Sequence, residues 1–148
     1  TPHAKVIMIE LIVYGTPIPQ PRHKMTRSGH TWDPGKAIKQ AFLDKCRNSA
    51  PKSPLCGAIS MSIDFYIPRP KAHYRTGQYS NILKDSAPKY PITRGGKNHL
   101  GDLDNYLKLV MDALDKVFYG DDVQVCVVHT IKEYSSNPRT VIQIKVAE

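Results

Sequence analysis

The chain of 148 residues has the usual length of one domain, and a core of that size buries roughly two thirds of the surface that the unfolded chain exposes. Its 21 Lys and Arg against 13 Asp and Glu give a net charge of +8, which favours a polyanionic partner over an acidic small molecule. No stretch approaches the roughly 20 apolar residues of a membrane-spanning helix, and no signal peptide is visible. We therefore expect a single soluble, cytoplasmic domain over residues 1–148, with no membrane partner.

Cysteine and histidine usage argues against a disulfide framework and against a transition-metal site. The three cysteines are odd in number and far apart, at Cys46, Cys56 and Cys126, which does not match the paired spacing of a zinc site. The six histidines are equally scattered.

The first third of the chain predicts a strand, a loop and a helix. Residues Ile7, Ile9, Leu11 and Val13 alternate, and because the opposite face is also partly apolar we expect this strand in the centre of a sheet. A proline-rich loop over 15–21 follows and continues into basic residues. Asp33 before Pro34 is a typical helix start, and apolar spacing then predicts a helix from about Pro34 to Asn48.

A second strand and a long basic loop occupy the middle of the chain. Apolar residues alternate from Ile59 to Ile67 with Ser60, Ser62 and Asp64 on the other face, which is the clearest strand pattern in the sequence. From 68 to 99 the pattern gives way to prolines, glycines, tyrosines and bases. A structureless connection of that length is unusual unless it is functional or disordered.

The last third predicts a second helix and two strands. One apolar stripe runs from Leu103 to Phe118, with Asp104, Lys108, Asp112 and Asp115 away from it. Val123, Val125 and Val127 begin a third strand, and Asn137-Pro138 turns the chain into a fourth with Ile142, Ile144 and Val146. The expected fold is α+β, a small mixed four-stranded sheet with two helices packed against it.

Six of the 13 acids are concentrated in one short stretch of this basic chain, at Asp102, Asp104, Asp112, Asp115, Asp121 and Asp122. Like charges gathered in this way repel, so a bound cation that relieves the repulsion is the physical expectation. Carboxylate oxygens suit Mg²⁺, which keeps water and substrate phosphate as its other ligands. If the third strand runs beside the first turn of the helix, the two ends of the acidic stretch can meet.

Each of these acids also has a structural interpretation. Asp102 is a plausible helix N-cap, and Asp104 with Lys108 is a plausible surface ion pair. Gly120 and Asp121 fit an ordinary turn, which explains Asp122 less well. We assign Asp112 and Asp115 to the solvent-exposed face of the helix.

The run Gly101-Asp102-Leu103-Asp104-Asn105-Tyr106-Leu107-Lys108, followed by Asp112-Ala113-Leu114 and Asp121-Asp122-Val123-Gln124-Val125, resembles the signature of the RusA family of Holliday junction resolvases. The segment Gly15-Thr16-Pro17-Ile18-Pro19-Gln20-Pro21-Arg22-His23-Lys24 is similar to the opening strand and basic loop of that family. The two likenesses span most of the chain and leave 68–99 unmatched. Tyr106 stands where the family usually has leucine, and residues 115–119 depart from its commoner linker.

The resemblance implies a homodimer whose essential carboxylates and metal ligands are Asp102, Asp104 and Asp122, with Asp121 as an adjacent assisting ligand. It also implies Lys108 as an essential basic partner. The expected cofactor is Mg²⁺, for which Mn²⁺ can substitute, and metal lowers the pKa of a bound water that attacks the phosphodiester. Because a four-way junction is two-fold symmetric, a C2 dimer presents one site to each of two strands.

The basic side chains are expected to hold phosphates of branched DNA. Trp32, Tyr74, Tyr79 or Tyr90 are expected to stack on unpaired nucleobases. The candidate DNA-binding residues are Arg22, Lys24, Arg27, Arg69, Lys71, Arg75 and Lys84. The alternative is a solvated basic loop.

The expected function is therefore a magnesium-dependent, structure-specific endodeoxyribonuclease that resolves Holliday junctions by paired symmetric incisions in recombination and repair at the nucleoid. Two alternatives stay open: a flap or branched-DNA nuclease with the same metal site, and a non-catalytic nucleic-acid-binding or replication-partner module.

Overall fold

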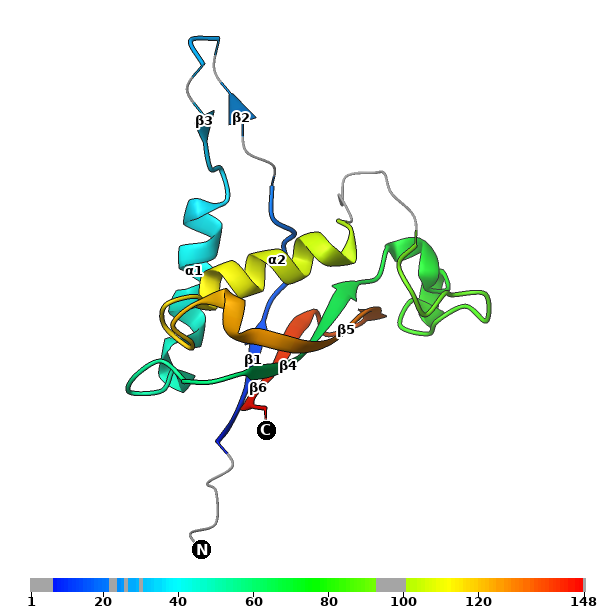
Figure 1. Ribbon diagram of the computed structural model, residues 1–148. Coiled ribbons are helices and arrows are strands. Elements are labelled where there is room, and N and C mark those ends of the chain that lie inside the picture. The colour runs from blue at the N-terminus through cyan, green and yellow to red at the C-terminus, as the bar shows by residue number, and fades with distance from the viewer. Residues whose placement is uncertain (1–6, 22–23, 26, 30, 93–100, 148) are drawn as a thin grey trace, which may run out of the picture.

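The protein folds around a mixed four-stranded sheet that carries two α-helices on one face. The computed structural model describes residues 7–21, 24–25, 27–29, 31–92 and 101–147. The strands are β1 (Met8–Tyr14), β4 (Ile59–Pro68), β5 (Val125–Ser135) and β6 (Arg139–Val146), in the order β1-β6-β4-β5. Within this sheet β4 and β5 run parallel, and the other two described pairs are antiparallel. Helices α1 (Lys36–Cys46) and α2 (Leu103–Leu114) lie against the sheet (Figure 1), which confirms the α+β prediction.

Two short strands, β2 (Lys24–Met25) and β3 (Thr31–Trp32), pair as a separate hairpin between β1 and α1. The predicted helix start is displaced slightly, because Gly35 is the N-cap residue of α1 and Asp33 accepts a hydrogen bond from the Gly35 N–H at 2.8 Å. Short 3-10 turns continue the chain at η1 (Arg47–Ser49), η2 (Lys71–His73), η3 (Gly77–Tyr79) and η4 (Asp122–Gln124). The hairpin extends beyond α1 at the top of Figure 1, whereas the segment after β4 extends to the right of the sheet.

The prediction that the first strand is central was wrong, because β1 is an edge strand paired with β6 alone. Its inward face is buried at Leu11 and Val13, whereas Met8, Ile12 and Tyr14 on the other face are 53%, 48% and 62% exposed. The apolar residues of the second face are therefore exposed, on the side of the sheet opposite the helices. The interior strands are β6 and β4, and buried and half-buried residues alternate along the whole length of β4.

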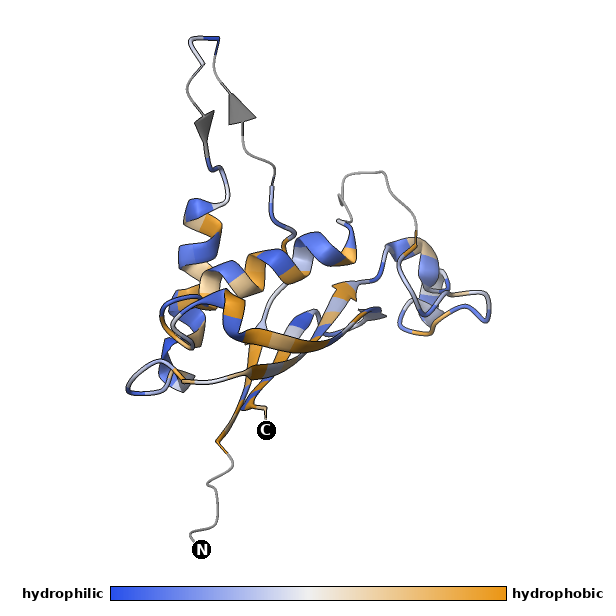
Figure 2. Ribbon diagram, in the orientation of Figure 1, coloured by the Kyte–Doolittle hydropathy of each residue, from blue (hydrophilic) through white to orange (hydrophobic). Residues whose placement is uncertain are grey.

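The core lies between the helix-facing side of the sheet and the apolar stripe of α2 (Figure 2). Ile59, Ile63 and Phe65 of β4 are fully buried, as are Ile142 and Ile144 of β6. Burying an aliphatic side chain of this size contributes about 1.5–3 kcal/mol. The apolar stripe that predicted α2 continues in the sequence beyond the end of the helix at Leu114. Val117 and Phe118 pack on the core from the turn that follows.

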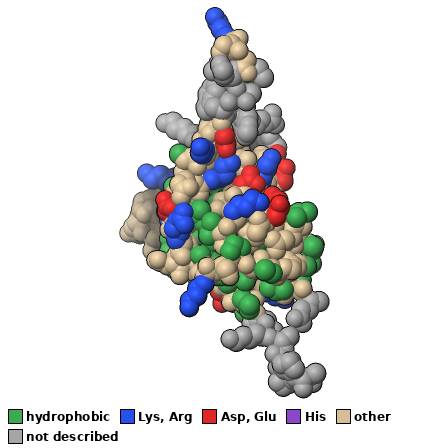
Figure 3. Space-filling model, turned by 60° about the vertical axis from the view of Figure 1, so that its left-hand side comes forward, with side chains coloured by type: hydrophobic (Ala, Val, Ile, Leu, Met, Phe, Trp, Pro, Cys, Tyr) green, Lys and Arg blue, Asp and Glu red, His purple; other side chains and the backbone are tan. Residues whose placement is uncertain are grey.

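Charged side chains of both signs lie on one face of the protein (Figure 3). On the face that includes α1, acidic and basic groups are interspersed and hydrophobic groups gather below them (Figure 3). Among the described helices, none is long and apolar enough to cross a membrane.

Candidate metal centre and nucleic-acid surface

The acidic turn, residues 115–122, joins α2 to β5 and gathers three carboxylates. One oxygen from each of Asp115, Asp121 and Asp122 lies within 4.8 Å of the others. Asp115 is the C-cap residue of α2, with extended backbone, and Lys116 then takes a left-handed conformation at φ 70°. This reversal turns the chain back so that Tyr119 bridges to Asp115 and brings Asp121 and Asp122 beside the helix end.

Hydrogen bonds from buried groups hold the acidic turn in place. The Tyr119 hydroxyl donates to the Met111 carbonyl at 2.7 Å, and the Leu55 N–H donates to the Phe118 carbonyl at 2.8 Å. The Gln124 amide donates to the carbonyls of Leu55 and Gly57, both at 3.0 Å, and Gln124 also completes a capping box with Asp121. Because a buried tyrosine and a glutamine fix its backbone, the turn presents its carboxylates without needing to reorganise.

The pKa values of the acidic turn reflect crowded negative charge. A hydrogen bond with the Asp121 carboxyl raises the pKa of Asp122, and burial with the charges of Asp115, Asp121 and Asp112 raises it further. The pKa of Asp121 is lowered, first by the hydrogen bond from the Val123 N–H and then by Asp122 and Lys116. Burial raises the pKa of the Tyr119 phenol, and the charges of Asp115, Asp122 and Asp112 raise it further. A cation bound here would therefore relieve a repulsion that the fold itself imposes.

The donor chemistry of the acidic turn fits Mg²⁺. All three groups offer hard oxygen ligands, and the Oδ1 atom of Asp115 is shielded from solvent without a hydrogen-bond partner. The Lys116 ammonium lies 4.0 Å from Oδ2 of Asp115 and 3.5 Å from Oδ2 of Asp121. Lys116 therefore acts as a tethered cation at this cluster.

The structure does not bring the predicted ligands Asp102 and Asp104 to Asp122 within one chain. The two residues lie at the start of α2, and Asp104 precedes Leu114 by ten positions, which is about 15 Å along the axis. Strand β5 leaves the acidic turn and runs back beside α2, so that Lys132, and not Asp122, reaches the Gly101 carbonyl, at 3.3 Å. Lys108 is exposed on α2, between Asp104 at the start of the helix and the acidic turn after its end.

The N-terminal end of α2 has its own fixed geometry. Asp102 is the N-cap residue, but its carbonyl accepts from Asn105 and Tyr106 at 3.0 and 3.2 Å, whereas its side chain does not cap the helix. The proline-rich loop packs here, because the Gln20 N–H donates to the Asn105 carbonyl at 3.0 Å. A Cβ on Gly101 would lie 2.4 Å from Cβ of Pro19, so glycine permits this close approach.

Sequence reasoning missed Asp115, which it assigned to solvent together with Asp112. Both side chains are half-buried, and Asp115 belongs to the carboxylate cluster. The end of α2 at Leu114 was the missing information, because it moves the Asp115 side chain out of helical register.

The predicted DNA-binding bases fall into different environments. Arg69 is engaged within the protein: its Nη1 donates to the Pro88 carbonyl at 2.7 Å and its guanidinium lies 5.4 Å from the Tyr134 ring centroid. Lys71, Arg75 and Lys84 line a common hollow. Arg27 is exposed, Lys24 lies in β2, and Arg22 falls outside the described residues.

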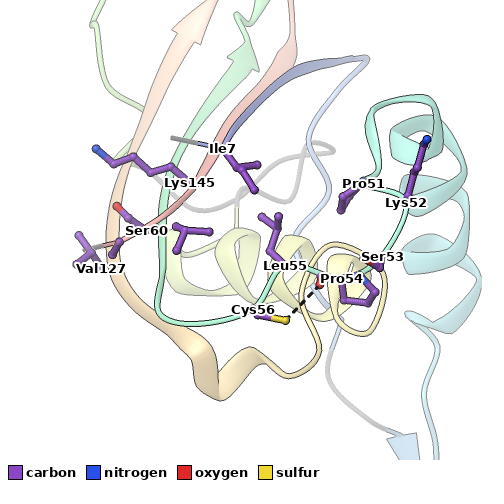
Figure 4. Close-up of a pocket in the computed structure, with 12 residues that line it drawn as sticks. Ile7, Pro51, Lys52, Ser53, Pro54, Leu55, Cys56, Ser60, Val127 and Lys145 are labelled. Carbon is purple, nitrogen blue, oxygen red and sulfur yellow. Dashed lines mark hydrogen bonds between the residues drawn. The ribbon is translucent and has the colours of Figure 1, made fainter. Parts of the chain in front are cut away.

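A separate cavity of about 850 Å³ lies between the 51–56 loop, the start of β5 and the end of β6 (Figure 4). Apolar side chains such as Leu55, Pro54 and Val127 line it, and its charged groups are Lys52 and Lys145. None of the described residues that line this cavity is a carboxylate, so these residues do not form a magnesium site.

Two comparisons with known proteins gave matches over most of the chain. A family model described as Endodeoxyribonuclease RusA matches residues 14–145. A protein of Bacillus subtilis (strain 168), named uncharacterized protein YqaN, is 34% identical over 142 residues, which cover 93% of this chain and 95% of that protein. The range matched by the family model includes Asp102 and Asp104, the acidic turn and the basic segment after β4.

Proposed function

Because the chain belongs to the RusA family of endodeoxyribonucleases, we propose that it is a magnesium-dependent enzyme that resolves four-way DNA junctions by paired symmetric incisions in recombination and repair. The observation that carries this proposal is the gathering of Asp115, Asp121 and Asp122 by a turn that the core holds in place, in a chain of net charge +8. The positive charge of the chain attracts the phosphates of DNA, but the carboxylate cluster repels them. A metal ion bound to the carboxylates would remove this repulsion and allow a phosphodiester to bind beside them. This activity would place the protein at the cytoplasmic nucleoid.

In this proposal Asp122 holds the metal, with Asp121 and Asp115 beside it. When bound, Mg²⁺ supplies a water of lowered pKa and neutralises charge on the scissile phosphate, and Mn²⁺ is expected to substitute. Asp121 keeps its charge at neutral pH because the Val123 N–H holds its carboxylate. The Lys116 side chain, 65% exposed, is free to swing toward solvent when a divalent ion arrives. Lys108 is available to orient a phosphate from the neighbouring turn of α2.

We further propose that Asp102 and Asp104 complete this site from a second protomer. In one chain they lie at the opposite end of α2 from Asp122, so a single chain cannot use all three on one phosphate. Two α2 helices related by a two-fold axis and packed antiparallel would place Asp104 of each protomer near the acidic turn of the other. The dimer would then present two equivalent sites, as paired incision requires. Light scattering tests assembly, since a mass near 16.6 kDa at micromolar concentration with and without DNA contradicts it.

The decisive experiment co-expresses two differently tagged chains, one carrying Asp104→Asn and the other Asp122→Asn, and purifies the mixed species. If the site is shared, the mixed dimer has one intact site and nicks one strand of a synthetic four-way junction in Mg²⁺. If each site lies within one chain, every site carries a lesion and no nicking occurs. The matched control pairs Asp115→Asn with Asp122→Asn, which stays inactive because both changes lie in the acidic turn.

Mapping cuts on all four strands separates this function from its rivals. Two symmetric cuts in opposed strands support junction resolution, whereas single cuts on flaps favour a flap nuclease. The absence of cutting by the parent protein in Mg²⁺ and in Mn²⁺ would leave a non-catalytic DNA-binding module.

A further inference from the structure

Residues 68–92, here the basic arm, form a folded unit, although the sequence suggested a structureless loop over 68–99, of which 93–99 lie outside the described residues. Tyr74 bridges to Leu83, the Arg75 N–H donates to the Ile82 carbonyl at 2.8 Å, and the Lys84 N–H donates to the His73 carbonyl at 2.9 Å. The turns η2 and η3 lie within the same unit. The basic arm therefore has a fixed backbone on which side chains are held in defined positions.

The basic arm is anchored to the far end of β5 through part of its charge. The His73 ring packs edge-on against Tyr134 at a centroid separation of 4.8 Å, and Arg69 lies over the same tyrosine. The Tyr134 N–H donates to the Lys89 carbonyl at 2.9 Å, and the Lys89 ammonium lies 3.6 Å from Glu133. Arg69 and Lys89 thus hold the arm to the sheet. The other basic side chains of the arm are available to bind a ligand.

The remaining three bases of the arm converge on one hollow of about 590 Å³, the arm hollow, lined by Lys71, Tyr74, Arg75, Thr76, Ser80 and Lys84 with Ala72 and Gly77. The arm contains a single acid, Asp85, whose carboxylate lies 3.7 Å from Arg75 and points into solvent. Among the described residues, Lys71 and Lys84 have no ion-pair partner.

Convergence of three cations on one hollow costs electrostatic energy, and within the described part of the arm the single acid Asp85 offsets it only at Arg75. Burial lowers the pKa of His73, and the charges of Arg69 and Lys84 lower it further, which agrees with a positive field across the arm. Hydroxyl groups of Tyr74, Thr76 and Ser80 add hydrogen-bond donors around the same space. Ammonium, guanidinium and hydroxyl donors around an open hollow are the groups that bind phosphate oxygens in proteins.

We propose that the arm hollow binds a backbone phosphate of DNA and so holds one flank of the substrate outside the carboxylate site. That the polyanion is DNA rests on the proposed function, whereas the preference for a phosphate rests on the hollow itself. Lys71, Arg75 and Lys84 contact the phosphate, and Arg69 positions the arm without touching DNA. The hollow belongs to neither carboxylate group of α2, so it contributes to affinity and not to the cleavage step.

The test compares Lys71→Gln/Arg75→Gln/Lys84→Gln with a control of equal charge change, Arg47→Gln/Lys52→Gln/Lys145→Gln. The control residues are exposed, and Arg47 pairs with Asp44 much as Arg75 pairs with Asp85. Junction affinity is measured over a salt series in EDTA, so the result does not depend on cleavage. Each lost phosphate contact removes about 0.9 from the slope of log affinity against log salt, and weakens binding about tenfold at 0.1 M salt.

The expected result is this loss of slope in the hollow variant alone, with an unchanged single-turnover cleavage rate at saturating protein. A second variant, Ser80→Asp, puts a negative charge into the hollow and should weaken binding in the same direction. An unchanged slope, an equal loss in the control, or a collapsed saturated rate overturns the proposal. If the parent binds DNA with the expected slope but never cuts it, the nuclease assignment fails and the arm hollow stands.

Discussion

Replacing Lys116 with asparagine tests whether this residue is a tethered cation at the acidic turn. Lys116 adopts φ 70°, a left-handed conformation that costs an ordinary L-residue roughly 1–2 kcal/mol and that asparagine tolerates better. Its ion pairs are weak contributors to stability because its side chain is 65% exposed. The metal-free variant should therefore be as stable as the parent or more stable by about 1 kcal/mol, equivalent to roughly 2–4 °C in Tm.

The same substitution should tighten Mg²⁺ binding. Two unit charges 4 Å apart in water repel by about 1 kcal/mol, and a divalent ion doubles this figure to about 2 kcal/mol. Salt screening and the freedom of the lysine to swing away reduce the gain to about tenfold in Kd, since 1.4 kcal/mol is one decade. Calorimetric titration of Mg²⁺ into the parent, Lys116→Asn and the exposed control Lys52→Asn measures this change. Equal affinities in parent and Lys116→Asn, or equal tightening in the control, would refute the reasoning.

Three further perturbations act on separate parts of the molecule. Asp104→Asn should abolish junction cleavage while retaining binding in EDTA, and near-normal cleavage by the purified variant would contradict its role at the site. Tyr134→Leu removes the ring under His73 and Arg69, so limited proteolysis should cut within Pro68–Ile92 faster, with most of the sheet still protected; identical digestion patterns would argue against this anchor. Burial and nearby positive charges lower the pKa of His73, so the unfolded arm takes up a proton more readily than the folded arm. The stability of the arm is therefore complete above the ordinary histidine pKa of 6.5 and falls as the pH drops below that value. Hydrogen exchange of the arm at pH 7.5 and 5.5, after correction for the intrinsic exchange rate, should show this loss, and His73→Gln should remove it.

The strands and helices were predictable because local periodicity and burial coincide in them. Strand β4 alternates buried and half-buried residues along its length, and α2 presents one continuous apolar stripe, so the patterns of the sequence are those of the structure. Strand β1 shows the limit of this reasoning. Ile12 and Tyr14 make its second face apolar, yet no helix covers that face, and sequence alone does not tell an exposed apolar face from a buried one.

The composition of the acidic site was visible in the sequence, but its grouping was not. Which carboxylates meet depends on the direction of β5 relative to α2, a tertiary feature that no local pattern carries. Asp115 was missed because Val117 and Phe118 continue the helical stripe beyond Leu114. A lysine with positive φ gives no signal of a reversal, whereas a glycine at that position would have indicated one.

The basic arm shows a different limit, because its fold is built from backbone hydrogen bonds and ring contacts without hydrophobic periodicity. Its prolines and short turns were correctly distinguished from strand or helix, but its order depends on Tyr134, which is distant in sequence. Arg69 and Lys71 look alike in the sequence. Only the structure shows that Arg69 is engaged with Pro88 and Tyr134 while Lys71 faces the arm hollow.

Gly101→Ala should separate the folding of α2 from the placement of its acidic N-terminal end. The added Cβ would lie 2.4 Å from Cβ and 2.8 Å from Cγ of Pro19, and because a proline ring cannot rotate away, the 15–21 loop or the first turn of α2 must move. Overpacking of this kind costs about 1–3 kcal/mol, and the shift displaces Asp102 and Asp104. We therefore expect a Tm lower by several degrees and a larger loss in the single-turnover cleavage rate than in junction affinity. Adding Pro19→Gly removes both contacting atoms and should restore the cleavage rate, whereas a parent-like Tm for Gly101→Ala, or no recovery in the double variant, would mean that this contact does not position the carboxylates.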